Sequence, residues 1–111
     1  MSKRIVCPVK RFTGSVELKD PLPYLTCVMF ESAARDMRAA GKKDKGDIGV
    51  YFLPVILGAV EKGELQNWPA SIANIEAFPG SPRGKVMELI AWLTSEISLI
   101  YKGNEDNDPN E

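Results

Sequence analysis

The sequence predicts a mainly α fold of the α+β class, with a small N-terminal β-hairpin, about three helices and a disordered acidic tail. Three observations support it. β-Branched and alternating residues gather in the first 18 positions. Apolar residues recur at three- and four-residue steps in three later segments, the last of them long and amphipathic. The chain of 111 residues fits one small domain, placed at residues 1–103, and residues 104–111 carry four acids and no base.

The hairpin is expected within residues 3–18. The run "RIVCPV" is β-branched, and "SVEL" alternates polar and apolar residues, which places Val16 and Leu18 on one face. Thr13 and Gly14 offer a turn between the two runs. Pro8 has no backbone N–H to donate, so it confines the first run to a sheet edge.

A first helix is predicted over residues 23–40. Pro23 suits the first helical position, and Gly41 suits the stop. The helical stripe expected to face the core comprises Leu25, Val28, Met29, Ser32, Ala33 and Met37.

A second helix is predicted from a cap at Asp47 to a stop at Gly63. Most of "IGVYFLPVILGAV" is apolar, so this helix should be central to the core. Pro54 should either kink this helix or mark its true first turn. The residues expected to repeat along it are Ile48, Tyr51, Phe52, Val55, Ile56, Ala59 and Val60.

Residues 64–80 are expected to form an irregular connection. Trp68 and Phe78 each precede a proline there, and we expect them to anchor the segment on the core. One short helical turn fits "ASIANIEAF".

The last helix is predicted over residues 82–102, after a Ser81 cap and with Pro82 in its first turn. Trp92 and Leu99 lie off its main apolar stripe and widen it, so we expect self-association. The stripe consists of Val86, Leu89, Ile90, Leu93, Ile97, Ile100 and Tyr101.

The stretch "FPGSPRGKV" at residues 78–86 does not fit a phosphate-binding loop. Only three residues separate its glycines, valine follows the lysine where a hydroxyl residue is needed, and its prolines remove backbone donors. Arg83 and Lys85 oppose the positive end of the helix dipole. A solvated face is the simple interpretation, and an acidic partner surface is the alternative.

No catalytic, cofactor-binding or metal-binding residues are predicted, and we expect no enzymatic activity. Histidine is absent, and the carboxylates fall mostly in polar loops or on polar helix faces. Cys7 and Cys27 lack an evident base partner, and two thiols alone cannot build a zinc site. We expect buried or half-buried free thiols, with a redox pair as the minor alternative.

The chain has no run of about 18 apolar residues and no signal-peptide pattern at its start. We therefore expect a cytoplasmic protein that is neither secreted nor bound to a membrane. The formal net charge is −1; without residues 104–111 the balance is 14 basic to 11 acidic residues, or +3. That excess is too mild to indicate a nucleic-acid binder.

Three segments of the chain are familiar in combination: "FTGSVELKDPLPYLTCVMFESA", "FLPVILGAVEKGELQNWP" and "EAFPGSPRGKVMELIAWLTSEISLIYKG", followed by a "PNE" end. Together they resemble the tail assembly chaperones of long-tailed phages and prophages over residues 12–111. The matching positions are Gly14, Val16, Leu18 and Leu22, then Phe52, Leu53, Pro54 and Ile56, then Phe78, Pro79, Ser81 and Pro82.

The resemblance implies a non-enzymatic protein of the bacterial host cytoplasm. Such chaperones bind the tape-measure protein and keep it soluble while tail-tube subunits polymerise around it, so the tube protein is a possible second partner. The family provides no catalytic residues. The candidate partner-binding residues are Trp68, Phe78, Arg83, Lys85, Trp92 and Leu99.

Two other functions stay open from the residues. One is another phage structural or adaptor protein, such as a head–tail connector or a virion subunit. The other, less favoured, is a small nucleic-acid-binding regulator that uses the lysines of residues 42–45 with Arg83 and Lys85.

Overall fold

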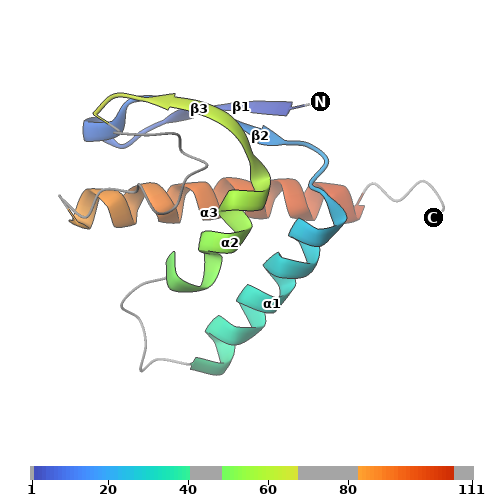
Figure 1. Ribbon diagram of the computed structural model, residues 1–111. Coiled ribbons are helices and arrows are strands. Elements are labelled where there is room, and N and C mark those ends of the chain that lie inside the picture. The colour runs from blue at the N-terminus through green and yellow to red at the C-terminus, as the bar shows by residue number, and fades with distance from the viewer. Residues whose placement is uncertain (1, 41–48, 68–82, 107–111) are drawn as a thin grey trace.

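The computed structural model describes residues 2–40, 49–67 and 83–106. Figure 1 shows a β-sheet along one side of the long helix α3 and the helix pair α1 and α2 on its other side. The elements, in chain order, are β1 (Ser2–Cys7), a 3-10 turn (Lys10–Phe12), β2 (Gly14–Lys19), α1 (Tyr24–Ala40), α2 (Gly49–Ala59), β3 (Val60–Leu65) and α3 (Arg83–Asp106).

The sheet has three antiparallel strands in the order β1-β2-β3. The two predicted strands pair with Ile5 opposite Val16, and Val16 and Leu18 are fully buried on the inner face, as predicted. β1 is an edge strand. The ion pair between Lys3 and Glu96, with Nζ and Oε2 3.9 Å apart, links β1 to α3.

The third strand was not predicted. The second helix ends at Ala59 rather than at Gly63, and residues 60–65 form β3 instead of helix and irregular connection. β3 satisfies the backbone groups of the free edge of β2, with Gly63 opposite Val16 and Leu65 opposite Gly14. Gly14 has φ +147, and a Cβ there would overlap a carbonyl oxygen of β3, so this pairing requires glycine.

α1 begins one residue later than predicted. The predicted stripe is correct in part, because the core is contacted by Met29, Ala33 and Met37. Leu25 and Val28 are 67% and 40% exposed, whereas Thr26 is only 3% exposed. The reason is α2, which runs antiparallel beside α1 (Figure 1) and brings Gly58 against Thr26. This close approach sets which face of α1 is buried.

α2 contains no charged residue, and the predicted repeat largely faces the core. Phe52, Val55, Ile56 and Ala59 are all buried. Pro54 lies inside the helix, so the alternative that it marks the first turn is wrong.

α3 buries the predicted stripe, and Leu89, Leu93 and Ile97 are fully buried. The helix passes through Gly103 and ends at Asp106, so the predicted stop is wrong and residues 104–106 of the predicted tail are helical. A glycine disfavours a helix by only about 1 kcal/mol, which an established helix tolerates. Residues 107–111 lie outside the described part of the chain. Among the helices described, none is long and apolar enough to span a membrane.

Candidate partner-binding groove

An open groove of about 510 Å³ lies where α1, α2 and α3 meet. α1 begins beside the C-terminal end of α3 and then runs away from it (Figure 1). The groove is lined by Phe30, Ala34 and Met37 of α1, Phe52 of α2, and Ala91, Thr94, Ser95, Ser98, Leu99 and Lys102 of α3.

Aromatic contacts fix one end of the groove. The Phe30 ring stacks on Tyr101 of α3 at a centroid distance of 4.7 Å, and it meets Phe52 of α2 edge-on at 5.6 Å. The Tyr101 hydroxyl donates a hydrogen bond to the Glu31 carboxylate at 2.6 Å. All three helices are therefore joined at Phe30, and the groove is preformed at that end.

The two walls of the groove differ in chemistry. On α1, Phe30, Ala34 and Met37 follow the i, i+4, i+7 spacing of one helix face and provide apolar contacts. On α3, Ala91 and Ser95 belong to a wall of small side chains, which allows a second backbone to come close. The hydroxyl groups of this wall keep its surface partly polar.

The rim residues of α3 give the groove an apolar and a charged contact. Leu99 is 57% exposed although it is a large apolar residue. Lys102 is exposed and adds a positive charge near the fixed end. Thr94 donates its hydroxyl to the Ile90 carbonyl at 2.9 Å, so this polar group is already bonded within the helix. The arrangement can take up an amphipathic helix with an acidic residue near Lys102.

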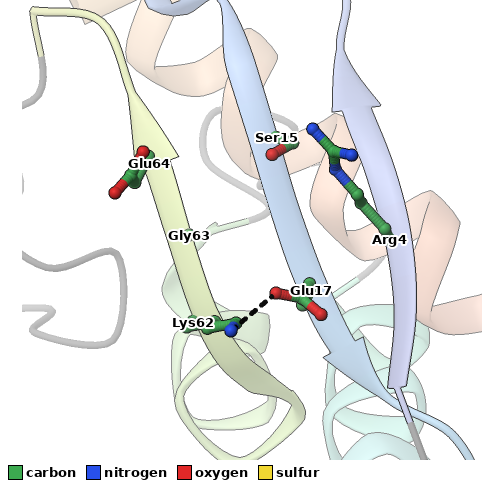
Figure 2. Close-up of a pocket in the computed structure, with 6 residues that line it drawn as sticks. All are labelled: Arg4, Ser15, Glu17, Lys62, Gly63 and Glu64. Carbon is green, nitrogen blue, oxygen red and sulfur yellow. Dashed lines mark ion pairs between the residues drawn. The ribbon is translucent and has the colours of Figure 1, made fainter.

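A second hollow, of about 500 Å³, lies on the outer face of the sheet and is polar. Figure 2 shows Glu17 between Arg4 and Lys62, on three adjacent strands. The Lys62 ammonium is 3.3 Å from the Glu17 carboxylate, which also accepts a hydrogen bond from Ser2 at 3.1 Å. Lys62 and Ser2 lower the pKa of Glu17. Because these charges largely satisfy one another, the hollow is the weaker candidate site.

The two cysteines are free thiols, as expected, and lie on different elements. Burial raises the pKa of Cys7, and burial with the nearby Glu31 charge raises the pKa of Cys27. Both thiols are therefore held protonated and poorly nucleophilic at neutral pH. Nowhere in residues 2–40, 49–67 and 83–106 do three cysteine or carboxylate side chains gather as a metal site would require.

The structure places four of the six predicted partner-binding residues, and it does not bring them all together. Leu99 lies in the groove, whereas Trp92 is half-buried and packs against the core. Arg83 and Lys85 lie in the first turn of α3, where the Lys85 ammonium is 3.6 Å from Glu88. The other two, Trp68 and Phe78, lie outside the described residues, as do Asp47, Ser81, Pro82 and the lysines of residues 42–45.

The sequence interpretation missed the α1 wall of the groove. The spacing of Phe30, Ala34 and Met37 was a signal for it, but we assigned Met37 to the core-facing stripe and left Phe30 and Ala34 out. Comparisons of the chain with models of protein families, with curated proteins and with solved structures found no match. The function is therefore inferred from the chain's own residues and their geometry.

Proposed function

We propose that the protein is a non-enzymatic tail assembly chaperone of a long-tailed phage or prophage, acting in the cytoplasm of the bacterial host. It binds the tape-measure protein and keeps it soluble during tail assembly. The sequence motifs of this protein class support the proposal. The observation that carries it is the groove, an exposed and mainly apolar surface between helices that are already fixed to one another.

A tape-measure helix would lie along the α3 wall, with its apolar face towards Phe30, Met37 and Phe52. Apolar side chains at i, i+3 or i+4, and i+7 of such a helix match a groove of this type. The small side chains of α3 let the bound backbone approach. Leu99 covers the outer edge of the bound helix, and Lys102 pairs with an acidic residue on it.

This geometry suits transient binding. Leu99 is exposed in the free protein, so binding removes apolar surface from water without unfolding the chaperone. The groove is open, so a bound helix can leave when the tube subunits polymerise around the tape-measure protein.

The test is co-expression of the protein with a tape-measure protein of the same phage or prophage. We expect the chaperone to raise the soluble fraction of the tape-measure protein and to co-purify with it. Leu99→Glu places a charge against the apolar face of the bound helix and should weaken binding by about 1–3 kcal/mol, or roughly 5- to 150-fold. If the tape-measure protein is equally soluble with and without the chaperone, the proposal is wrong.

The matched control is Val6→Glu. Val6 is 73% exposed and lies in β1, on the sheet and away from the groove. The same charge at this position should leave client solubility unchanged. Equal loss with both variants would mean that the groove is not the binding surface.

The other two functions predict different outcomes. A head–tail connector or virion subunit would be found in purified phage particles, whereas a chaperone would not. A nucleic-acid-binding regulator would shift DNA in a salt-dependent manner. Either result, without an effect on the tape-measure protein, would replace the proposal.

A further inference from the structure

One exposed face of α3 has a residue pattern that is symmetric about Ser95. Glu88 precedes Ser95 by seven residues, and Lys102 follows it by seven. Ala91 precedes Ser95 by four residues, and Leu99 follows it by four. Spacings of four and seven keep side chains on one face of a helix, and all five of these residues are exposed. We call these five residues the outer face of α3.

A face with this symmetry is complementary to a second copy of itself when the two helices lie antiparallel. If Ser95 of one copy lies beside Ser95 of the other, each residue before Ser95 meets the residue at the same distance after it. Leu99 of each copy then meets Ala91 of the other. In the same way, Lys102 of each copy meets Glu88 of the other. The two-fold symmetry makes each contact twice.

The charges select the antiparallel orientation. A parallel pair with the same centre places Glu88 beside Glu88 and Lys102 beside Lys102, and like charges that face each other repel. The antiparallel pair brings opposite charges together at both ends. The Glu88 carboxylate is 3.6 Å from the Lys85 ammonium of its own helix, but its side chain is 57% exposed and is open to a second cation.

Leu99 provides the apolar part of the contact. It is a large apolar residue that is 57% exposed, so a second copy that covers it removes apolar surface from water. Ala91 and Ser95 are small, which lets the two helix backbones approach and leaves room for Leu99 of the other copy.

We propose that the protein forms a symmetric antiparallel dimer through the outer face of α3, centred on Ser95. Between Glu88 and Lys102 the contact extends over roughly 21 Å, at 1.5 Å per residue. One helix pair of this length buries less surface than a standard interface, so the dimer is weak and reversible.

The dimer covers part of the groove. Ala91, Ser95, Leu99 and Lys102 belong both to the outer face and to the α3 wall of the groove. A second copy on the outer face therefore competes with a client helix for this wall. The competition rests on the proposed function, whereas the dimer itself does not.

Sedimentation velocity of the full chain, with no client present, tests the dimer. At about 0.1 M salt, between roughly 10 µM and 1 mM protein, we expect the sedimentation coefficient to rise from that of the 12.2 kDa monomer to that of the dimer. A monomer over the whole range would overturn the proposal. Growth beyond the dimer would also overturn it, because a two-fold contact is closed.

Charge reversal tests the pairing of Glu88 with Lys102. E88K leaves a cation on each side of Ser95, and K102E leaves an anion on each side, so each variant repels its own copies. We expect each alone to raise the dissociation constant of the dimer at least about 10-fold at low salt. An equimolar mixture of the two should dimerise again, because the cations of one meet the anions of the other at both ends.

The matched controls are E61K in β3 and K10E in the 3-10 turn, two reversals at exposed positions outside α3. Both should associate like the unaltered protein. Failure of the E88K and K102E mixture to associate, or equal loss with the controls, would refute the antiparallel contact.

Ser95→Cys tests the centre of the contact. Helix axes about 10 Å apart and a Cα radius of about 2.3 Å leave roughly 5 Å between two facing Cα atoms, a separation that a disulfide can bridge. Oxidation with diamide should therefore link S95C into a covalent dimer. S2C, at an exposed position of β1, is the control and should stay monomeric. No linked S95C, or equal linking of both variants, would refute a dimer centred on Ser95.

Client binding is a separate measurement. E88K keeps Leu99 and Lys102 but opposes the dimer, so it should bind the co-expressed tape-measure protein at least as well as the unaltered protein does. Weaker binding by E88K would refute the competition and leave the dimer to the measurements without client. Absence of binding by both proteins would instead overturn the proposed function.

Discussion

Gly58→Ala tests the close approach of α1 and α2, which sets the buried face of α1 and one wall of the groove. A Cβ atom at Gly58 would lie 2.7 Å from Oγ1 of Thr26, too close for a real contact. The Cβ and Cγ2 atoms of Thr26 would be at 3.6 and 3.7 Å, which are ordinary contacts. The conflict therefore involves a single oxygen atom, on a side chain that is only 3% exposed.

Two opposing effects determine the magnitude. Alanine is favoured over glycine inside a helix by about 1 kcal/mol, whereas an extra methyl group in a packed contact costs about 1–3 kcal/mol. We expect Gly58→Ala to lower the free energy of unfolding by about 1 kcal/mol as the net of the two. In a Thr26→Ala background the oxygen is gone, and the same change should instead raise stability by up to about 1 kcal/mol.

Urea unfolding of the four proteins of this double-mutant cycle measures the change of sign. Gly103→Ala is the control, because a Cβ there meets nothing within 4 Å and α3 continues past it; this change should stabilise by about 0.5–1 kcal/mol. The contrary result would be that Gly58→Ala, in the protein that keeps Thr26, is as stabilising as Gly103→Ala. In that case α1 and α2 would not approach as closely as described.

Three further predictions concern the sheet and α3. Gly14→Ala should destabilise by more than about 1 kcal/mol in urea unfolding, because of the positive φ and the carbonyl oxygen of β3; a neutral effect would contradict the β2–β3 pairing. Leu93→Ala should cost about 2–5 kcal/mol, whereas Leu99→Ala should stay within about 0.5 kcal/mol in thermal unfolding; equal losses would place Leu99 in the core. The pKa of Glu17 is lowered by folding, so its pairing with Lys62 stabilises the fold above the unfolded-state value of about 4.5, and this contribution is lost as pH falls through the folded pKa. NMR titration should show a lowered pKa for Glu17, and in Lys62→Met this pKa should return towards its ordinary value. If the pKa of Glu17 were the same in the variant, a group other than Lys62 would be responsible for the shift.

Local patterns were sufficient for much of the fold. The alternation around Val16 and Leu18 identified an inner strand face, and the stripe of α3 was identified because its apolar residues repeat over many turns. β3 was missed because Val60 continues the helical repeat of α2, while the residues that follow it are mostly polar. Residues 60–65 form a strand because they pair with β2, and the paired residues of β2 are more than 40 positions away in the sequence.

The groove could be predicted only in part, because it depends on how three helices meet. The sequence identified Leu99 as an apolar residue off the main stripe of α3, and the structure places it in the groove. It did not identify Phe30, and it assigned Met37 to the core-facing stripe rather than to a groove, since the face of α1 that is left open depends on Gly58 of α2. Trp92 has the same apolar character as Leu99 but packs against the core. This difference can be predicted only when the positions of the neighbouring elements are known.

Site-specific photo-crosslinking tests most directly whether the groove holds the tape-measure protein. A photoreactive residue at position 98, where Ser98 lines the groove, should crosslink the co-expressed tape-measure protein. The same residue at position 2, where Ser2 is exposed on β1, should not. Crosslinking from position 2 alone, or from neither position in a co-purified complex, would contradict binding in the groove.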